Sequence, residues 1–192
     1  GLAFGLYLLA LWRIARWERH QRPESHSGLL LGWIFLVSIA ARLLLVGTPP
    51  TLSSDLYRYR WDGKVQSAGM DPYRYPPDAP ELAPLRDEQD QHINFPRLRT
   101  VYPPLTQAVF RLGNSLGGTL TAQKALFVAA EFLVALGILL LLRRRNRSLL
   151  WLAAYLWHPL VLLEIAGSGH NDALGAGWLW LGLAALESRR WT

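Results

Sequence analysis

Five long apolar runs dominate this sequence and limit what it can fold into. They are Gly1–Ile14, Gly28–Val46, Ala122–Leu142, Leu149–Ala166 and Ala173–Leu186. As helices, the second, third and fourth are about 27–32 Å long, which matches a hydrocarbon core of about 30 Å, whereas the first and last reach only about 21 Å. A large soluble core is the alternative, but three full-length runs with almost no charge disfavour it. The sequence therefore predicts an all-α, polytopic transmembrane bundle of about five spans.

Arginine clusters between the runs predict the orientation of this bundle. They consist of Arg13, Arg16, Arg19, Arg22, Arg143, Arg144, Arg145, Arg147, Arg189 and Arg190. If the spans alternate, all of these residues lie on one side, and the positive-inside rule makes that side the cytoplasm. Segment 47–120 and the turn 167–172 then lie outside. We expect one transmembrane domain over residues 1–192, as part of a larger membrane protein, because the chain starts at Gly1 and its single Met is Met70.

The distribution of charge excludes other classes of protein. The net charge is +6, and nearly all charged residues lie outside the apolar runs. A nucleic-acid binder would gather its basic residues in a stripe on one folded surface, so we expect no nucleic-acid partner. The chain contains no Cys, which excludes disulfides and thiolate metal sites.

Segment 47–120 is predicted to be an ordered outer loop with short helices, and not a flexible linker. Ser53 and Ser54 can cap a helix that starts near Asp55. Turn residues from Gly69 onward end that helix. Residues 82–91 are typical of a short polar helix, and residues 104–116 form an amphipathic pattern that fits a helix lying in the outer membrane interface.

The first polar cluster of interest lies on the helix that starts near Asp55. One face of it carries Asp55, Arg58, Tyr59, Asp62 and Gln66. Arg60 and Lys64 point the other way. A carboxylate beside cations can take a proton from a hydroxyl nucleophile, while the cations hold a phosphate. An interfacial helix with solvated salt bridges and aromatic anchors fits the composition equally well.

The second polar cluster is the turn that contains His170, Asn171 and Asp172, on the same predicted side. Gly167 and Gly169 allow tight turns and a close approach to a ligand. His170 and Asp172 are possible metal ligands, although two ligands are a weak metal signal. Hydrogen bonding to a sugar or a lipid phosphate fits equally, as does a plain cap in which Asn171 or Asp172 begins the fifth span.

Three ionisable residues lie inside the predicted spans. Arg42 is near the outer end of its span, so it can snorkel or face an outer cavity. Glu131 lies midway through its span, where it must be protonated or paired inside the bundle. His158 precedes Pro159, which predicts a kink, and we expect His158 to be an interior residue with satisfied hydrogen bonds.

Taken in order, the motifs resemble the first large periplasmic loop of bacterial membrane glycosyltransferases of the GT-C superfamily. The matching pieces are Pro49-Pro50, Ser54–Tyr59, Trp61-Asp62-Gly63, Pro72–Pro77, Tyr102-Pro103-Pro104 and Gly167–Asp172. The sequence is most similar to polyprenol-phosphate-mannose-dependent mannosyltransferases. It departs from their pattern at Asp71-Pro72-Tyr73, where those enzymes have Asn-Pro-Tyr, and this departure bears on loop geometry.

The resemblance implies transfer of a sugar, expected to be mannose, from a polyprenyl-phosphate donor on the extracytoplasmic face of a bacterial inner membrane. Loop 47–120 would be the catalytic part, with Asp55 as the base that deprotonates a hydroxyl of a glycan or glycolipid acceptor. Arg58, Arg60, Lys64 and Arg74 are the candidates for stabilising the phosphate leaving group. The further candidates for substrate binding are Tyr59, Asp62, Tyr102, His170, Asn171 and Asp172.

The resemblance also implies membrane lipids as partners, with no metal and no cofactor. The rival function is a transporter or flippase for a lipid-linked sugar, which would also use charges inside the membrane such as Arg42 and Glu131. Transport would favour paired half-helices in an inverted repeat, and the sequence contains no such repeat.

Overall fold

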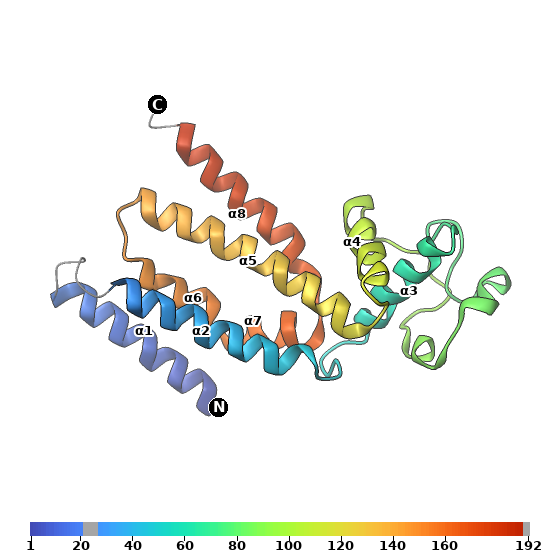
Figure 1. Cartoon of the computed structure of the whole chain (residues 1–192), viewed down its shortest axis with the longest axis horizontal. Helices are drawn as coiled ribbons and strands as arrows, with labels where there is room; N and C mark the ends of the chain where they lie inside the picture. The colour runs from blue at the N-terminus through green and yellow to red at the C-terminus, as the bar shows by residue number, and fades with distance from the viewer. Residues whose placement is uncertain (21–26, 190–192) are drawn as a thin grey trace.

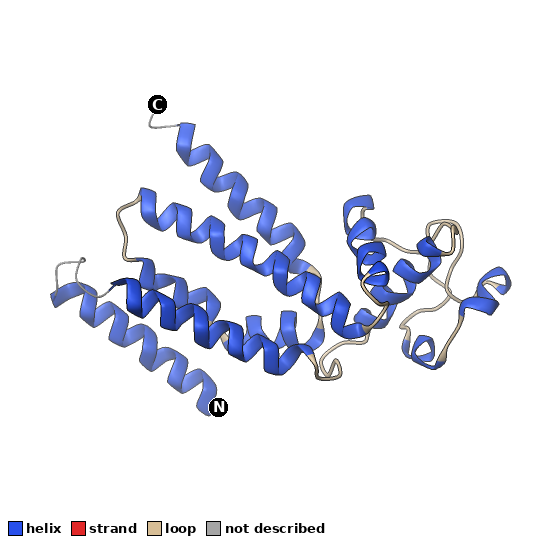
Figure 2. Cartoon of the chain, in the orientation of Figure 1, coloured by secondary structure: helices blue, strands red, loops and turns tan. Residues whose placement is uncertain are grey.

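The computed structural model describes residues 1–20 and 27–189. Every regular element in these ranges is helical, with no strand (Figure 2). This confirms the all-α class. Arg22 and Arg190, which belong to the predicted basic clusters, lie outside the described residues. Long helices form a bundle at one end of the molecule, and the shorter helices of the large loop (residues 47–120) gather at the other end (Figure 1).

Four long helices make up most of the bundle. They are α1 (Leu2–His20), α2 (Ser27–Val46), α5 (Leu120–Arg144) and α8 (Asp172–Arg189). Helices α5 and α8 lie side by side (Figure 1). A Cβ atom at Gly137 would lie only 2.7 Å from Cβ of Trp180. Glycine is therefore what allows these two helices to approach so closely, as small residues do in membrane helix pairs.

Two of the described helices, α2 and α5, are long and apolar enough to cross a membrane. The segments 149–156 and 159–168 count as a third span if the bent pair is taken together. Helices α1 and α8 do not meet the same criterion of length and composition within the described residues. Two or three of the five predicted spans thus have direct structural support.

The length of the fourth apolar run alone suggests one continuous helix, but the structure divides this run into four short helices. It consists of η3 (Leu149–Leu152), α6 (Ala153–Leu156), α7 (Pro159–Val161) and η4 (Leu162–Ser168). Its two halves meet at an angle of 52°. Pro159 has no N–H to donate, and the Tyr155 carbonyl instead accepts the His158 N–H at 3.1 Å in a tight turn. The predicted kink is therefore confirmed.

The large loop contains α3 (Asp55–Ser67), η1 (Pro80–Leu85), η2 (Glu88–His92) and α4 (Pro104–Ser115). The single polar helix predicted over residues 82–91 is wrong, because two 3₁₀ helices take its place. Pro84 lies inside η1, and Asp87 has an extended backbone where η2 is capped. Helix α4 begins at Pro104 and ends before Gly117 and Gly118, both at positive φ, as the sequence predicts.

An aromatic core joins α3 and α4 to the bundle. Tyr59 stacks on Phe110 with ring centroids 4.7 Å apart, and both rings meet Phe127 of α5 edge-on. A Cβ atom at Gly63 would overlap the carbonyl oxygen of Phe110, so the glycine sets the spacing of α3 and α4. Because Tyr59 and Phe110 are buried against α5, the position of α3 is fixed relative to the bundle.

Helix α4 buries a polar side chain and exposes apolar ones. Gln107 is buried with Phe110 against α3, whereas Leu105, Leu112 and Leu116 are exposed. An exposed apolar stripe of this kind suits a helix that contacts lipid. Its placement in a membrane interface stays a prediction.

Two expectations about charges inside the bundle are wrong. Arg42 does not snorkel: it is buried and forms an ion pair with Glu131, which confirms the paired alternative for Glu131. The guanidinium also donates to Ser38 and to the Leu156 carbonyl, so this buried group has several hydrogen-bond acceptors. His158 is not satisfied, since its Nδ1 is buried and has no hydrogen-bond partner among the described residues.

Candidate active site

Asp55 is the first residue of α3, where the chain turns from the bundle into the large loop. The hydroxyl oxygen of Ser53 accepts the Asp55 N–H at 3.1 Å, whereas Ser54 at the cap position makes no side-chain bond to the helix. The Asp55 carboxylate is half-buried, and it has no ion-pair or hydrogen-bond partner within the described ranges. A helix N-terminus favours negative charge at this position.

A polar hollow of about 690 Å³ opens beside Asp55. Its polar lining consists of Thr51, Ser53, Ser54, Asp55, Tyr57, His92 and Asn94. The first five come from the chain that enters α3 and from its first turn; His92 is the last residue of η2, and Asn94 follows that helix. The sequence did not predict this hollow, because nothing in it indicates that residues 92–94 lie near residue 55.

The two predicted polar segments are in contact. The Leu52 N–H donates to the Ser168 hydroxyl at 3.3 Å. Gly169 has φ +78°, and a Cβ atom there would lie 2.8 Å from a methyl of Leu56. Only glycine fits both the left-handed backbone and this close approach. The α3 entry and the 167–172 turn are thus in direct contact.

Lys124 joins the same two segments, and our sequence reasoning missed it. Its ammonium is fully buried and donates to the carbonyl of Thr48 at 2.6 Å and to that of Gly167. One carbonyl belongs to the exit of α2 and the other to the end of η4. The only signal in the sequence is a lysine near the start of the apolar run 122–142.

The 167–172 turn lines a different hollow from Asp55. His170 and Asp172 border an apolar hollow of about 440 Å³ between α7, η4 and α8. His170 Nδ1 lies 2.6 Å from the carboxylate of Glu164. The Asn171 carbonyl accepts the Leu174 N–H at 3.0 Å, so it caps the start of α8. Within the described parts of the chain, no three His, Asp or Glu side chains are grouped to hold a metal ion.

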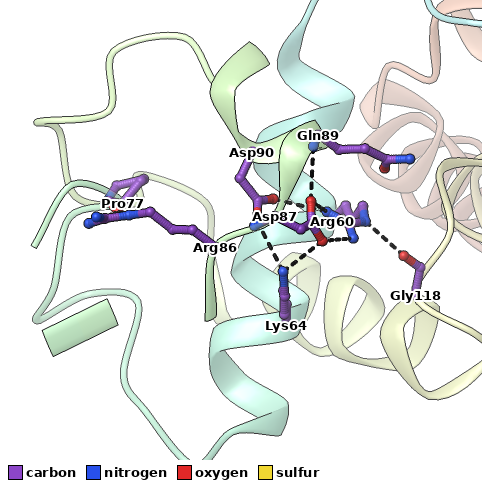
Figure 3. A network of polar contacts seen from close by, with 8 residues as sticks. All are labelled: Arg60, Lys64, Pro77, Arg86, Asp87, Gln89, Asp90 and Gly118. Carbon is purple, nitrogen blue, oxygen red and sulfur yellow. Dashed lines mark hydrogen bonds and ion pairs between the residues drawn. The ribbon is translucent and has the colours of Figure 1, made fainter. Parts of the chain in front are cut away.

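Two of the four candidate cations are bound to carboxylates of η2 (Figure 3). Arg60 pairs with Asp87 and with Asp90, the latter at 2.9 Å, and Lys64 pairs with the same two residues at 2.8 and 3.0 Å. Arg60 also donates to the Gly118 carbonyl. Hydrogen bonding from Arg60, supported by Lys64, holds the pKa of Asp87 well below its usual range. Both cations therefore fasten η2 to α3.

Arg58 lies on the opposite side of α3 and has a donor to spare. Its Nε donates to Asp62 at 2.8 Å, and Asp62 also accepts from the side chain of Gln107. Its Nη1 donates to the Leu98 carbonyl, but its Nη2 is buried and has no hydrogen-bond partner in residues 1–20 and 27–189. Asp62 is itself buried within this network. Arg74, the fourth candidate, is exposed and lies 5.3 Å from the ring of Tyr75.

The two tyrosines in the predicted set are part of the aromatic core. Burial raises the pKa of Tyr59, and so do Tyr102 and the nearby charges of Asp55 and Asp172. Tyr102 packs edge-on against Tyr59 at 5.1 Å. The charges of Asp55 and Asp172 thus both act on the hydroxyl of this buried tyrosine. Its proton is held firmly at neutral pH.

Apolar helices long enough to cross a membrane, with a polar loop domain at one end, indicate a membrane protein. Residues 2–192 match the family model described as alpha-(1->6)-mannopyranosyltransferase, N-terminal domain (MptA_B family). Because the match covers nearly the whole chain, the chain belongs to this family of mannosyltransferases, and the resemblance predicted from the loop motifs is confirmed. No curated protein and no solved structure gives a significant match.

Proposed function

We propose that this chain forms the catalytic loop and donor-binding part of an enzyme that transfers mannose from a polyprenyl phosphate to an acceptor hydroxyl. The reaction takes place on the extracytoplasmic face of a bacterial inner membrane, and Asp55 is the general base. Family membership supports mannosyl transfer. The observation that carries the role of Asp55 is its environment: this carboxylate borders a polar hollow, while Asp62, Asp87 and Asp90 are all engaged in ion pairs.

In the proposed step, the acceptor hydroxyl attacks the anomeric carbon of mannose and gives its proton to Asp55. The bond between that carbon and the phosphate oxygen breaks, and the polyprenyl phosphate leaves as an anion. Charge develops on the phosphate, so a fixed cation stabilises the transition state without a strong general acid. The unpartnered Nη2 of Arg58, one helical turn from Asp55, makes it our first choice among the candidate cations.

The apolar hollow fits the hydrocarbon chain of the donor. It is lined by Leu160, Val161 and Ile165, and it lies beside the 167–172 turn that contacts the entry to α3. We assign the first prenyl units of the lipid to it. The transporter alternative has no supporting observation, since the buried charges of Arg42 and Glu131 neutralise each other.

The test is Asp55→Asn in the complete enzyme, which keeps the size of the side chain and removes its basicity. Turnover should fall about 10²- to 10⁴-fold, the range for lost general-base catalysis. Binding of the lipid donor should survive, because cations hold its phosphate.

The matched control is Asp78→Asn, in the same loop. Its carboxylate is exposed and lies 3.8 Å from Arg97, so mannosyl transfer should stay near normal. Asp62→Asn is unsuitable, because Asp62 is buried between Arg58 and Gln107. Near-normal transfer by Asp55→Asn would rule out Asp55 as the base.

A further inference from the structure

The polar hollow beside Asp55 has an aromatic wall. Tyr57 and His92 face each other with ring centroids 4.9 Å apart and planes tilted by 39°. Both residues line the hollow, and His92 is exposed. The face of an aromatic ring carries partial negative charge, which attracts the partly positive C–H groups on one face of a sugar ring.

The ion pairs of η2 hold this wall in place. His92 is the last residue of η2, and the four contacts between Arg60, Lys64, Asp87 and Asp90 fasten that helix to α3 (Figure 3). Tyr57 precedes Arg60 by one turn on the same helix. The network is therefore the support that brings His92 against Tyr57, 35 residues apart in sequence.

The rest of the lining offers hydrogen bonds that suit hydroxyl groups. Ser53 and Thr51 each provide a hydroxyl that donates and accepts, Asn94 provides an amide, and the Asp55 carboxylate accepts. A volume of about 690 Å³ falls within the usual range of small-ligand sites, about 300–1,000 Å³. The other hollow, at the 167–172 turn, has an apolar lining and suits a hydrocarbon chain.

We infer that the hollow binds the acceptor, a glycan ending in a hexose, with the terminal sugar ring against Tyr57 and its primary hydroxyl toward Asp55. This inference rests on the proposed function, since a base must come within about 2.6–3.2 Å of the proton it removes. The 6-hydroxyl is the one used in an alpha-(1->6) linkage, which is the linkage in the family's description. A sugar stacked on Tyr57 can place that hydroxyl near the neighbouring carboxylate.

The test measures acceptor binding separately from transfer. Saturation-transfer NMR with alpha-1,6-linked mannobiose on the complete enzyme in detergent should show contact with the sugar ring protons. Tyr57→Leu and His92→Ala should weaken this signal, and each should raise the acceptor KM by about 2- to 10-fold, the effect of losing one aromatic contact. The value of kcat should stay within about twofold of the original.

Two variants serve as controls for these measurements. Tyr57→Phe keeps the ring and should restore the acceptor KM. Phe95→Ala removes an exposed aromatic of the same loop that does not line the hollow, and it should leave both the signal and the KM unchanged.

The outcomes separate this inference from the proposed function. An unchanged acceptor KM in Tyr57→Leu and His92→Ala would overturn the inference, even when Asp55→Asn abolishes transfer. A fall in kcat with an unchanged KM would also overturn it, because Tyr57 would then only support the helix that carries Asp55. Failure of the proposed function would appear instead as normal transfer by Asp55→Asn, while the NMR signal still reports on the hollow.

Discussion

Replacing Glu131 with Gln removes one charge from the buried pair with Arg42 and keeps the size of the side chain. Both carboxylate oxygens accept from the guanidinium, at Nε (2.9 Å) and at Nη2. In the variant the Arg42 charge stays buried, at 1% exposure, with only neutral acceptors around it. Breaking a buried pair from one side costs about 3–5 kcal/mol. At about 2–4 °C per kcal/mol for a chain of this size, Tm should fall by about 6–20 °C.

Thermal or denaturant unfolding in detergent, followed by Trp fluorescence, measures this loss directly. Trp157 is a suitable reporter because its indole N–H donates to the Ile34 carbonyl in the bundle. The double variant Arg42→Met, Glu131→Met removes both charges and should recover most of the stability, since apolar replacements of buried pairs are often neutral or better. A loss below about 1 kcal/mol in Glu131→Gln, or a double variant as unstable as the single one, would refute the reasoning.

Two other predictions concern orientation and the response of the large loop to acid. The chain contains no Cys, so single cysteines can report its orientation. Arg97→Cys should react with an impermeant thiol reagent from the outside, and Arg145→Cys should react only after the membrane is opened. The reverse labelling pattern would show that the predicted orientation is wrong. The lowered pKa of Asp87 stabilises the folded state above the unfolded pKa of about 3.9, and this contribution is lost as pH falls toward the folded value. The Tm difference between the original protein and Asp87→Asn should therefore be full at pH 7 and shrink below about pH 4, whereas a constant difference would argue against the ion pairs of Asp87.

Local patterns in the sequence predicted the features that depend on neighbouring residues. Helical periodicity placed Arg58 and Asp62 on one face of α3 and Arg60 and Lys64 on the other, and the structure confirms both faces. The kink at Pro159 follows from its missing N–H. The prediction for residues 82–91 was wrong because a polar stretch of this length is compatible with one α-helix or with two 3₁₀ helices. Only the position of Pro84 argues against a single α-helix.

Features that depend on distant parts of the chain were beyond such patterns. The partner of Arg42 lies 89 positions away, so the sequence predicted snorkelling or an outer cavity for Arg42 and did not identify Glu131 as its partner. Lys124 gave no sign that it bridges Thr48 and Gly167. The candidate site shows the same limit. The sequence identified Asp55, but it did not predict that His92 lies against Tyr57, because that contact depends on ion pairs between distant parts of the loop.

Element η4 (Leu162–Ser168) is a π-helix. The position of the 167–172 turn is therefore sensitive to the loss of a single residue from this helix. A π-helical turn bonds residue i to i+5, so it holds one residue more than an α-helical turn. Deleting one residue here would restore the α-helical pattern and rotate the following residues by about 100° around the helix axis. His170 would swing away from Glu164, and Gly169 would no longer face Leu56. During the divergence of this family, a single deletion in η4 would therefore break the contact between the 167–172 turn and the α3 entry, whereas most substitutions there would leave that contact intact.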